Sequence, residues 1–138
     1  MKLMVIDGQG GGIGSSIIRG LRESAGNDLE ILALGTNSIA TSSMMKAGAN
    51  RGGTGENSII WVSSRVNVII GPLAIIMANS MMGEVTPKMA SAVSSSEAKK
   101  LLIPLTQEKV HIVGVSGEPL PHLVFQVTEI IKEMMRDV

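Results

Sequence analysis

The chain has 138 residues, of which 44% are hydrophobic and 17% are charged, and its 12 basic and 12 acidic residues cancel. This composition is typical of a compact globular domain, and the balanced charge excludes the broad basic surface of a nucleic-acid-binding protein. One tryptophan and one phenylalanine are too few for a platform on which single-stranded bases stack. We therefore expect a single domain, residues 1–138, that binds a small molecule and no nucleic acid.

The composition also disfavours metal, redox and membrane functions. The chain has no cysteine, which excludes disulfides, thiolate nucleophiles, iron–sulfur clusters and cysteine zinc sites, and it has only two histidines. An apolar strand follows the first two residues directly, so we expect no signal peptide. The most apolar run, residues 68–82, is interrupted by Gly71 and Pro72 and is too broken to span a membrane. We expect a cytoplasmic protein with no metal and no membrane partner.

The first third of the chain alternates between strand and helix patterns. Residues 3–6 are continuously apolar, as in a parallel strand buried on both faces, and a helix pattern begins near Ser15. Gly20 weakens that helix, and we expect it to mark close packing of the helix on the sheet. The next apolar run, residues 30–34, predicts the second strand.

The middle of the chain combines a predicted helix, a glycine-rich segment and a third strand. A helix follows the second strand, and Thr36 or Ser38 is expected to cap its N-terminus. Residues 52–57 have the composition of a glycine-rich loop. The apolar run within 58–64 is too short to separate helix from strand, whereas 66–70 predicts a third strand.

The last half of the chain predicts three helices and two strands. Residues 73–82 have helical length and almost no charged face, and Thr86 followed by a proline is a strong helix-start signal. Two apolar runs, 101–105 and 110–115, predict strands. A final amphipathic helix is expected after Pro121.

This alternation predicts a three-layer, Rossmann-like α/β fold around a mostly parallel five-stranded sheet. Only residues 106–109 separate the last two predicted strands, which is too short for a crossover helix. We therefore expect the last strand to be an antiparallel edge strand. Because the carboxyl ends of parallel strands meet at one edge, the turns after the first three strands should face a common ligand crevice.

The loop after the first strand, Asp7 to Gly14, contains five glycines in its last seven positions. Such a turn between strand and helix leaves free N–H groups at the helix N-terminus, where an anion binds well. We expect this loop to hold the phosphate of a nucleotide or dinucleotide, with NAD or NADP as the favoured cofactor. The expected binding residues are Gly8, Gln9, Gly10, Gly11, Gly12, Ile13 and Gly14, joined by Thr36, Asn37, Gly71 and Pro72 from the neighbouring turns.

The pattern formed by Gly8, Gly12, Ile13 and Gly14 resembles the cofactor loop of the short-chain dehydrogenases. This resemblance covers only about the first forty residues. The dehydrogenases use a Tyr-x-x-x-Lys pair, and this chain has no tyrosine. An NAD site also places Asp or Glu after the second strand, where this chain has Thr36 and Asn37. Classical dehydrogenase chemistry is therefore not expected.

A broader resemblance covers nearly the whole chain. The segments that carry it are 6–14, 33–37, 46–50, 54–57, 69–72, 78–81, 83–90 and 120–123. Together they resemble a small bacterial family known only as a domain of unknown function. The resemblance implies a compact cytoplasmic protein and brings no activity, ligand or catalytic residue with it.

Several polar residues have both a structural and a functional interpretation. Asp7 either holds the turn through the loop amides or contacts a ligand, and residues 54–57 form either a second lip of the pocket or a helix cap. Glu84, Lys88 and His122 are the candidate catalytic residues, as acid–base groups. Equally, Glu84 simply favours a helix N-terminus and Lys88 points into water.

We expect a nucleotide-binding protein without classical dehydrogenase chemistry. One alternative is a small enzyme that acts on a nucleotide or a phosphorylated metabolite. Another is a non-enzymatic structural or oligomeric protein in which the glycine loop is only a turn. The apolar surface of the predicted helix 73–82 is hard to bury in so small a domain, so we also expect a homodimer.

Overall fold

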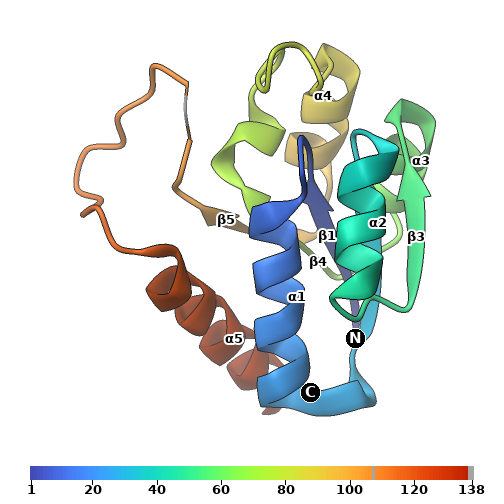
Figure 1. Ribbon diagram of the computed structural model, residues 1–138, viewed down its shortest axis with the longest axis vertical. Helices are drawn as coiled ribbons and strands as arrows, with labels where there is room; N and C mark the ends of the chain where they lie inside the picture. The colour runs from blue at the N-terminus through green and yellow to red at the C-terminus, as the bar shows by residue number, and fades with distance from the viewer. Residues whose placement is uncertain (107, 137–138) are drawn as a thin grey trace.

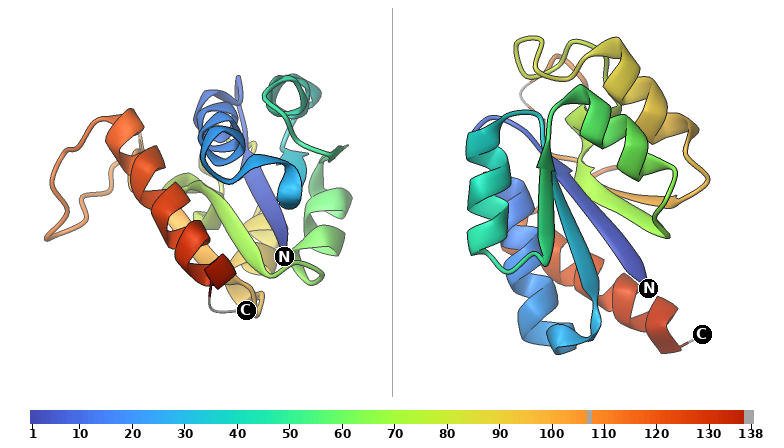
Figure 2. Two further views of the ribbon diagram at one scale, coloured as in Figure 1. Left: turned by 90° about the horizontal axis from the view of Figure 1, so that it is seen from below. Right: turned by 90° about the vertical axis from the view of Figure 1, so that its right-hand side faces the viewer.

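A five-stranded parallel sheet lies between two helical layers (Figures 1 and 2) in the computed structural model, which describes residues 1–106 and 108–136. The strand order is β3-β2-β1-β4-β5, with every neighbouring pair parallel. The order reverses between β1 and β4, as in a Rossmann-like α/β fold. The strands are β1 (Lys2–Asp7), β2 (Glu30–Gly35), β3 (Arg51–Thr54), β4 (Val68–Pro72) and β5 (Lys99–Ile103).

The helices divide between the two faces according to the alternation of side chains along the strands. Leu3 and Val5 of β1 point into the core beneath one layer, and Met4 and Ile6 point into the core beneath the other. The first layer consists of α1 (Gly12–Ala25), α2 (Ser38–Lys46) and α5 (Leu120–Arg136). The second consists of α3 (Glu56–Ser63), the 3-10 turn η2 (Leu73–Ile76) and α4 (Pro87–Ser95), while a 3-10 turn η1 (Gly26–Asp28) precedes β2.

The segment predicted as a second glycine-rich loop is in part the edge strand β3. Its residues pair in parallel with β2, with Leu32 opposite Arg51 and Gly35 opposite Thr54. A side chain at Gly52 would lie 2.8 Å from Thr41 Cγ2, because α2 packs directly over this strand. Small residues therefore suit this strand. They also give the segment the composition of a loop, so the sequence does not indicate a strand here. The ambiguous segment 58–64 falls mostly in α3.

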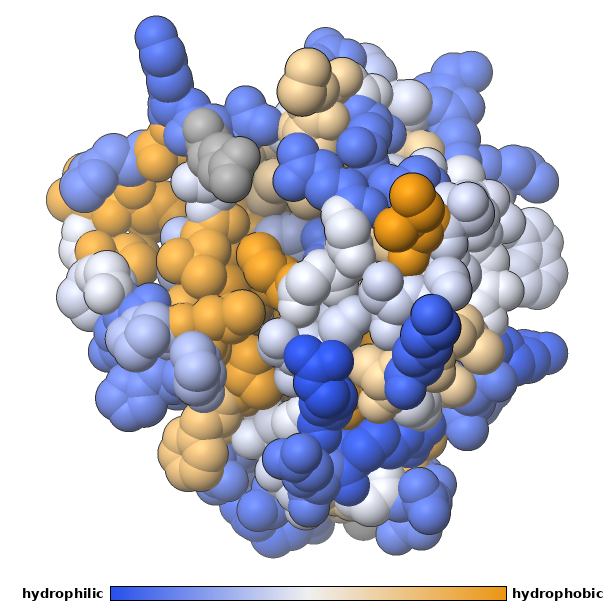
Figure 3. All heavy atoms as spheres, in the orientation of Figure 1, coloured by the Kyte–Doolittle hydropathy of each residue, from blue (hydrophilic) through white to orange (hydrophobic). Residues whose placement is uncertain are grey.

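The predicted antiparallel edge strand is wrong. Residues 110–115 form no strand, and β5 at this edge is parallel to β4. After β5 the described residues 104–106 and 108–119 are irregular and lie outside the sheet, and their apolar side chains face no strand partner; Val113 is 89% exposed. Figure 3 shows apolar side chains gathered on the side where this segment and α5 lie in Figure 1. The apolar run was the only signal for this strand, and Gln107 in the predicted link lies outside the described residues.

The predicted helix 73–82 is also wrong. Only the short turn η2 forms, and the backbone then adopts positive φ at Asn79 (67°), Met81 (54°) and Met82 (56°), which no α-helix permits. Ala74 and Ile75 are buried in the core, so the apolar helix face on which we based the homodimer does not exist. The homodimer stays a prediction without that support.

Helix ends were predicted best where the signal was local. Thr86 caps α4 by accepting a hydrogen bond from the Met89 amide at 3.1 Å, and the following proline occupies the first turn, as predicted. The cap of α2 is Asn37, whose side chain accepts from the Ala40 amide at 2.9 Å, and not Thr36 or Ser38. Among the described residues, no helix has both the length and the apolar character needed to cross a membrane.

Gly20 allows α1 to pack closely against α5, where we had expected a contact with the sheet. A Cβ at this position would lie 2.6 Å from Val124 Cγ1. Substituting Gly20→Ala should lower the free energy of unfolding, because overpacking of about 1–3 kcal/mol outweighs a gain of about 1 kcal/mol in helix propensity. Urea denaturation measures the change.

The control for this substitution is Gly12→Ala in the same helix, where a Cβ would meet no atom within 4 Å. In a Val124→Ala background, Gly20→Ala should cost less, since the new methyl group fills the space that valine vacated. A stabilising Gly20→Ala in the otherwise unchanged chain would contradict the close packing of these helices.

Candidate functional site

Asp7 ends β1 and holds the glycine loop in place. Its carboxylate accepts hydrogen bonds from the backbone amides of Gly8 at 2.8 Å and Gly14 at 2.7 Å, so it closes the loop from both ends. The residue is only 3% exposed. Burial raises the pKa of the Asp7 carboxyl, and the amides that bind it offset part of this effect. The structure shows the turn-holding role of Asp7, and because Asp7 also lines the cavity described below, its contact with a ligand stays a prediction.

The glycines of the loop serve two different purposes. A Cβ at Gly8 would lie 2.5 Å from Met81 Sδ, and one at Gly14 would lie 2.5 Å from Met44 Sδ, so these two glycines make room for the protein itself. Gly11 has a φ of 74°, which glycine adopts without strain. At Gly10 and Gly12, in contrast, a Cβ would meet nothing within 4 Å. These two glycines leave open space beside the backbone.

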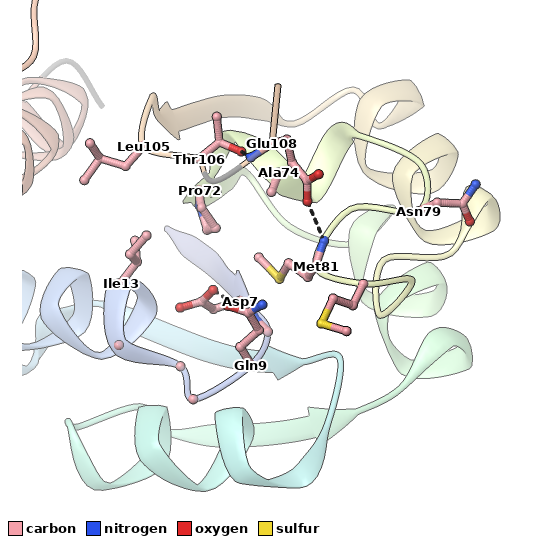
Figure 4. Close-up of a pocket in the computed structure, with 15 residues that line it drawn as sticks. Asp7, Gln9, Ile13, Pro72, Ala74, Asn79, Met81, Leu105, Thr106 and Glu108 are labelled. Atoms are coloured by element: carbon pink, nitrogen blue, oxygen red, sulfur yellow. Dashed lines mark hydrogen bonds between the residues drawn. The ribbon is translucent and has the colours of Figure 1, made fainter. Parts of the chain in front are cut away.

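The open space belongs to a cavity of about 670 Å³ at the carboxyl ends of β1 and β4. In Figure 4, Asp7, Gln9 and Ile13 lie on its α1 side, and Leu105, Thr106 and Glu108 lie on the opposite side. The cavity therefore lies where the strand order reverses, the usual ligand position in such a sheet. Its remaining lining residues are Gly8, Gly10, Gly11, Gly12, Pro72, Ala74, Asn79, Met81 and Met82.

Two backbone amides at this cavity are available to a ligand. The N–H groups of Gly10 and Gly12 donate to no acceptor within residues 1–106 and 108–136. Gly12 is the first residue of α1, so its amide lies at the positive end of the helix dipole. Open space and unused donors thus coincide at the same two glycines.

The cavity has an acidic lining. Asp7 and Glu108 are among its lining residues, which include no lysine, arginine or histidine. A phosphate at this site would depend on backbone amides rather than on a cationic side chain. In the part of the chain that the structure describes, no group of three or more acidic or histidine side chains is placed to hold a metal ion.

Glu84 connects three segments that are far apart in the sequence. Its Oε1 accepts hydrogen bonds from the Gln9 amide at 2.8 Å, from Thr36 Oγ1 at 2.7 Å and from Asn37 Nδ2 at 2.8 Å. Partial burial alone would raise the pKa of Glu84, but the three hydrogen bonds together hold it below its usual value. This carboxylate lies at the end of β2, where the sequence itself has no acid.

Glu84 is the last residue of a segment, 79–84, that we call the strap. The strap runs from the β4 side of the sheet to the glycine loop and the end of β2, and its Met81 amide donates to Glu108 Oε1 at 2.8 Å. Ser80, buried within it, donates to the carbonyl oxygen of Ala74 at 2.5 Å. The strap is therefore held on both sides of the glycine loop.

The structure brings only some of the predicted binding residues to the cavity. Thr36 and Asn37 bind Glu84 instead of lining it, and Gly71 packs so closely that a Cβ would lie 2.4 Å from the Ile6 carbonyl oxygen. Gly14 faces the core. The predicted residues that line the cavity are Gly8, Gln9, Gly10, Gly11, Gly12, Ile13 and Pro72.

The three candidate catalytic residues do not meet. Glu84 is occupied by its hydrogen bonds, and Lys88 is exposed on the first turn of α4. His122 is exposed at the start of α5, where its Nδ1 lies 3.4 Å from Glu118 Oε2. None of the three lines the cavity.

Sequence reasoning missed the opposite wall of the cavity. Ala74, Asn79 and Met81 fall within the segment predicted to be a helix, whereas Leu105 falls at the end of a predicted strand and Glu108 in the link to the next predicted strand. The only signal in the sequence for this wall is the set of polar residues that interrupt the apolar run after β4. Those residues do not indicate which part of the fold the segment faces.

The titration of Asp7 provides a test of its role. Its carboxyl has an ordinary pKa of 3.8, and the pKa is higher in the folded protein. The stability that protonation of this group contributes is therefore complete below pH 3.8 and is lost as the pH rises through the folded pKa. The free energy of unfolding of the wild type, minus that of Asp7→Asn, should therefore decline as the pH rises from 3.8 through the folded pKa of Asp7. Urea denaturation at a series of pH values measures this difference, and a difference that grows with pH would contradict the burial of this carboxyl.

The model of a family described as Domain of unknown function (DUF3842) matches residues 2–136. No curated protein sequence gives a significant match. Among solved structures, the chain is similar to one described as a dodecameric FMN-dependent Ubix-like decarboxylase from Escherichia coli O157:H7. The identity is 18% and the TM-score 0.47, over 98% of this chain and 76% of that chain. A likeness of this degree carries no argument about ligand or reaction.

Proposed function

The chain belongs to the DUF3842 family, a domain of unknown function, and from its site alone we propose that it binds a nucleotide-type ligand in the β1/β4 crevice. The ligand's phosphate lies at the N-terminus of α1, on the Gly10 and Gly12 amides. The whole chain acts as one domain in this function. The proposal includes mononucleotides and dinucleotides, NAD and NADP among them.

One observation carries the proposal: the glycines with unused amides are those with open space beside them. A turn whose glycines were needed only for packing would have each missing Cβ position filled, as at Gly8 and Gly14. At Gly10 and Gly12, a ligand can approach the backbone without meeting a side chain.

The rest of the cavity suits a nucleoside. Ile13, Leu105 and Met81 offer apolar surface for a flat base, and the side chains of Thr106 and Glu108 offer oxygens to ribose hydroxyls. Specific sites commonly combine a largely apolar wall with a few polar groups in this way.

Binding without catalysis is the preferred form of the proposal. The three acid–base candidates from the sequence are separated and absent from the cavity lining. The two carboxyl groups that do line it are engaged by backbone amides, Asp7 by those of Gly8 and Gly14 and Glu108 by that of Met81. The small enzyme and the structural protein remain the alternatives.

A thermal-shift screen with AMP, FMN, nicotinamide mononucleotide, NAD and NADP tests the proposal. At least one compound should raise the melting temperature, because a ligand at 100 times its Kd stabilises the folded state by about 2.7 kcal/mol. No shift with any compound at millimolar concentration would favour the structural alternative.

Substituting Gly12→Val should abolish that shift while the protein stays folded. The valine Cβ would meet no protein atom within 4 Å, and its side chain would take up space beside the loop that the ligand needs. Gly117→Val is the matched control, since Gly117 is exposed and also has no atom within 4 Å of a Cβ. An unchanged shift in Gly12→Val, measured by calorimetry and thermal shift together, would disprove the assignment of the loop.

A further inference from the structure

We propose that the strap restricts this site to ligands of mononucleotide size, with Glu84 and Met81 as the residues that exclude a second nucleotide. The inference rests on the proposed nucleotide binding and adds the class of ligand. The inference follows from the position of the strap, which occupies the space above the end of β2.

A dinucleotide in a Rossmann-like crevice extends to both sides of the glycine loop. One nucleoside lies toward the end of β2, where an acidic residue binds the ribose, and the other lies across the switch point. Both sides of the loop must therefore be open to the ligand. In this protein only the β4 side is.

On the β2 side, the protein fills the space itself. A Cβ at Gly8 would meet Met81 Sδ at 2.5 Å, Thr36 Oγ1 at 2.6 Å and Glu84 Oε1 at 3.1 Å. The missing side chain of Gly8 thus makes room for the strap. A pyrophosphate passing over this glycine would collide with the same atoms.

The polar groups that a second ribose would need are also occupied. Thr36 Oγ1 and Asn37 Nδ2 both donate to Glu84 Oε1, and Asn37 Nδ2 also donates to the Gln9 carbonyl oxygen at 2.9 Å. A dinucleotide would have to displace the Glu84 carboxylate. The Thr36 and Asn37 donors would then need new hydrogen-bond acceptors from the ligand.

The strap is built to stay in place. Three of its five residues other than glycine, Asn79, Met81 and Met82, have φ in the left-handed region, and such conformations persist only where the surroundings fix them. The Glu84 bonds fix one side and the bond from the Met81 amide to Glu108 fixes the other. The cavity that remains, about 670 Å³, is within the range that holds one drug-sized molecule.

The test compares dissociation constants of the wild type, Glu84→Ala and Met81→Ala for AMP, FMN, nicotinamide mononucleotide, NAD and NADP. In the wild type, the tightest mononucleotide should bind at least as tightly as either dinucleotide. Each substitution should favour the dinucleotide relative to that mononucleotide by about tenfold, equivalent to about 1.4 kcal/mol. Glu30→Ala, an exposed acid at the opposite end of β2, should leave the ratio unchanged.

The outcomes separate the inference from the proposed function. A dinucleotide that binds the wild type tenfold more tightly than every mononucleotide would overturn the inference and leave nucleotide binding intact. So would weaker dinucleotide binding in Glu84→Ala, since Glu84 would then be the ribose acceptor and not an obstacle. Absence of binding by all five compounds would overturn the proposed function and the inference with it. Met81→Ala keeps the test valid if Glu84→Ala does not fold.

Discussion

The site depends on a single buried carboxylate bound to the two ends of one loop. Asp7 accepts amides on both sides of the glycine run, and this pairing fixes the path of the chain from β1 into α1. It also fills part of the anion site that α1 would otherwise offer. A helix N-terminus carries roughly half a positive charge, so an internal carboxylate there leaves little net attraction for a second anion. Phosphate binding then depends on the two outward amides.

The acidic character of the cavity follows from that constraint. With Asp7 beneath the loop and Glu108 on the opposite wall, a highly charged phosphate chain meets repulsion and no cationic side chain. A ligand with few phosphates and several hydroxyl groups fits this environment better, because carboxylates accept hydrogen bonds from hydroxyls. The electrostatics and the strap therefore favour the same class of ligand for independent reasons.

The sequence predicts those features of this fold that depend on neighbouring residues. The buried strand before Asp7 and the Thr86–Pro87 helix start were both readable, since each signal lies within a few positions. The bonds from Glu84 to Thr36 and Asn37 span 48 and 47 residues, and no local pattern encodes them. Apolar residues after β4 indicated a helix because nothing in a methionine signals a left-handed backbone. The sequence shows that no acid follows β2, but it does not show that Glu84, which precedes the Thr86–Pro87 helix start, occupies that place in the folded chain.

Glycine content alone is therefore a weak guide to what a loop binds. In this loop Gly8 admits Met81, Gly14 admits Met44, and only Gly10 and Gly12 face open space. The dehydrogenase-like spacing that runs through Gly8, Gly12 and Gly14 thus includes two positions that serve internal packing. The same spacing arises whether a loop approaches a pyrophosphate or its own chain, because both require a missing Cβ. What distinguishes the two cases is which atoms lie beside each glycine, and here protein atoms lie on the β2 side and open space lies on the β4 side.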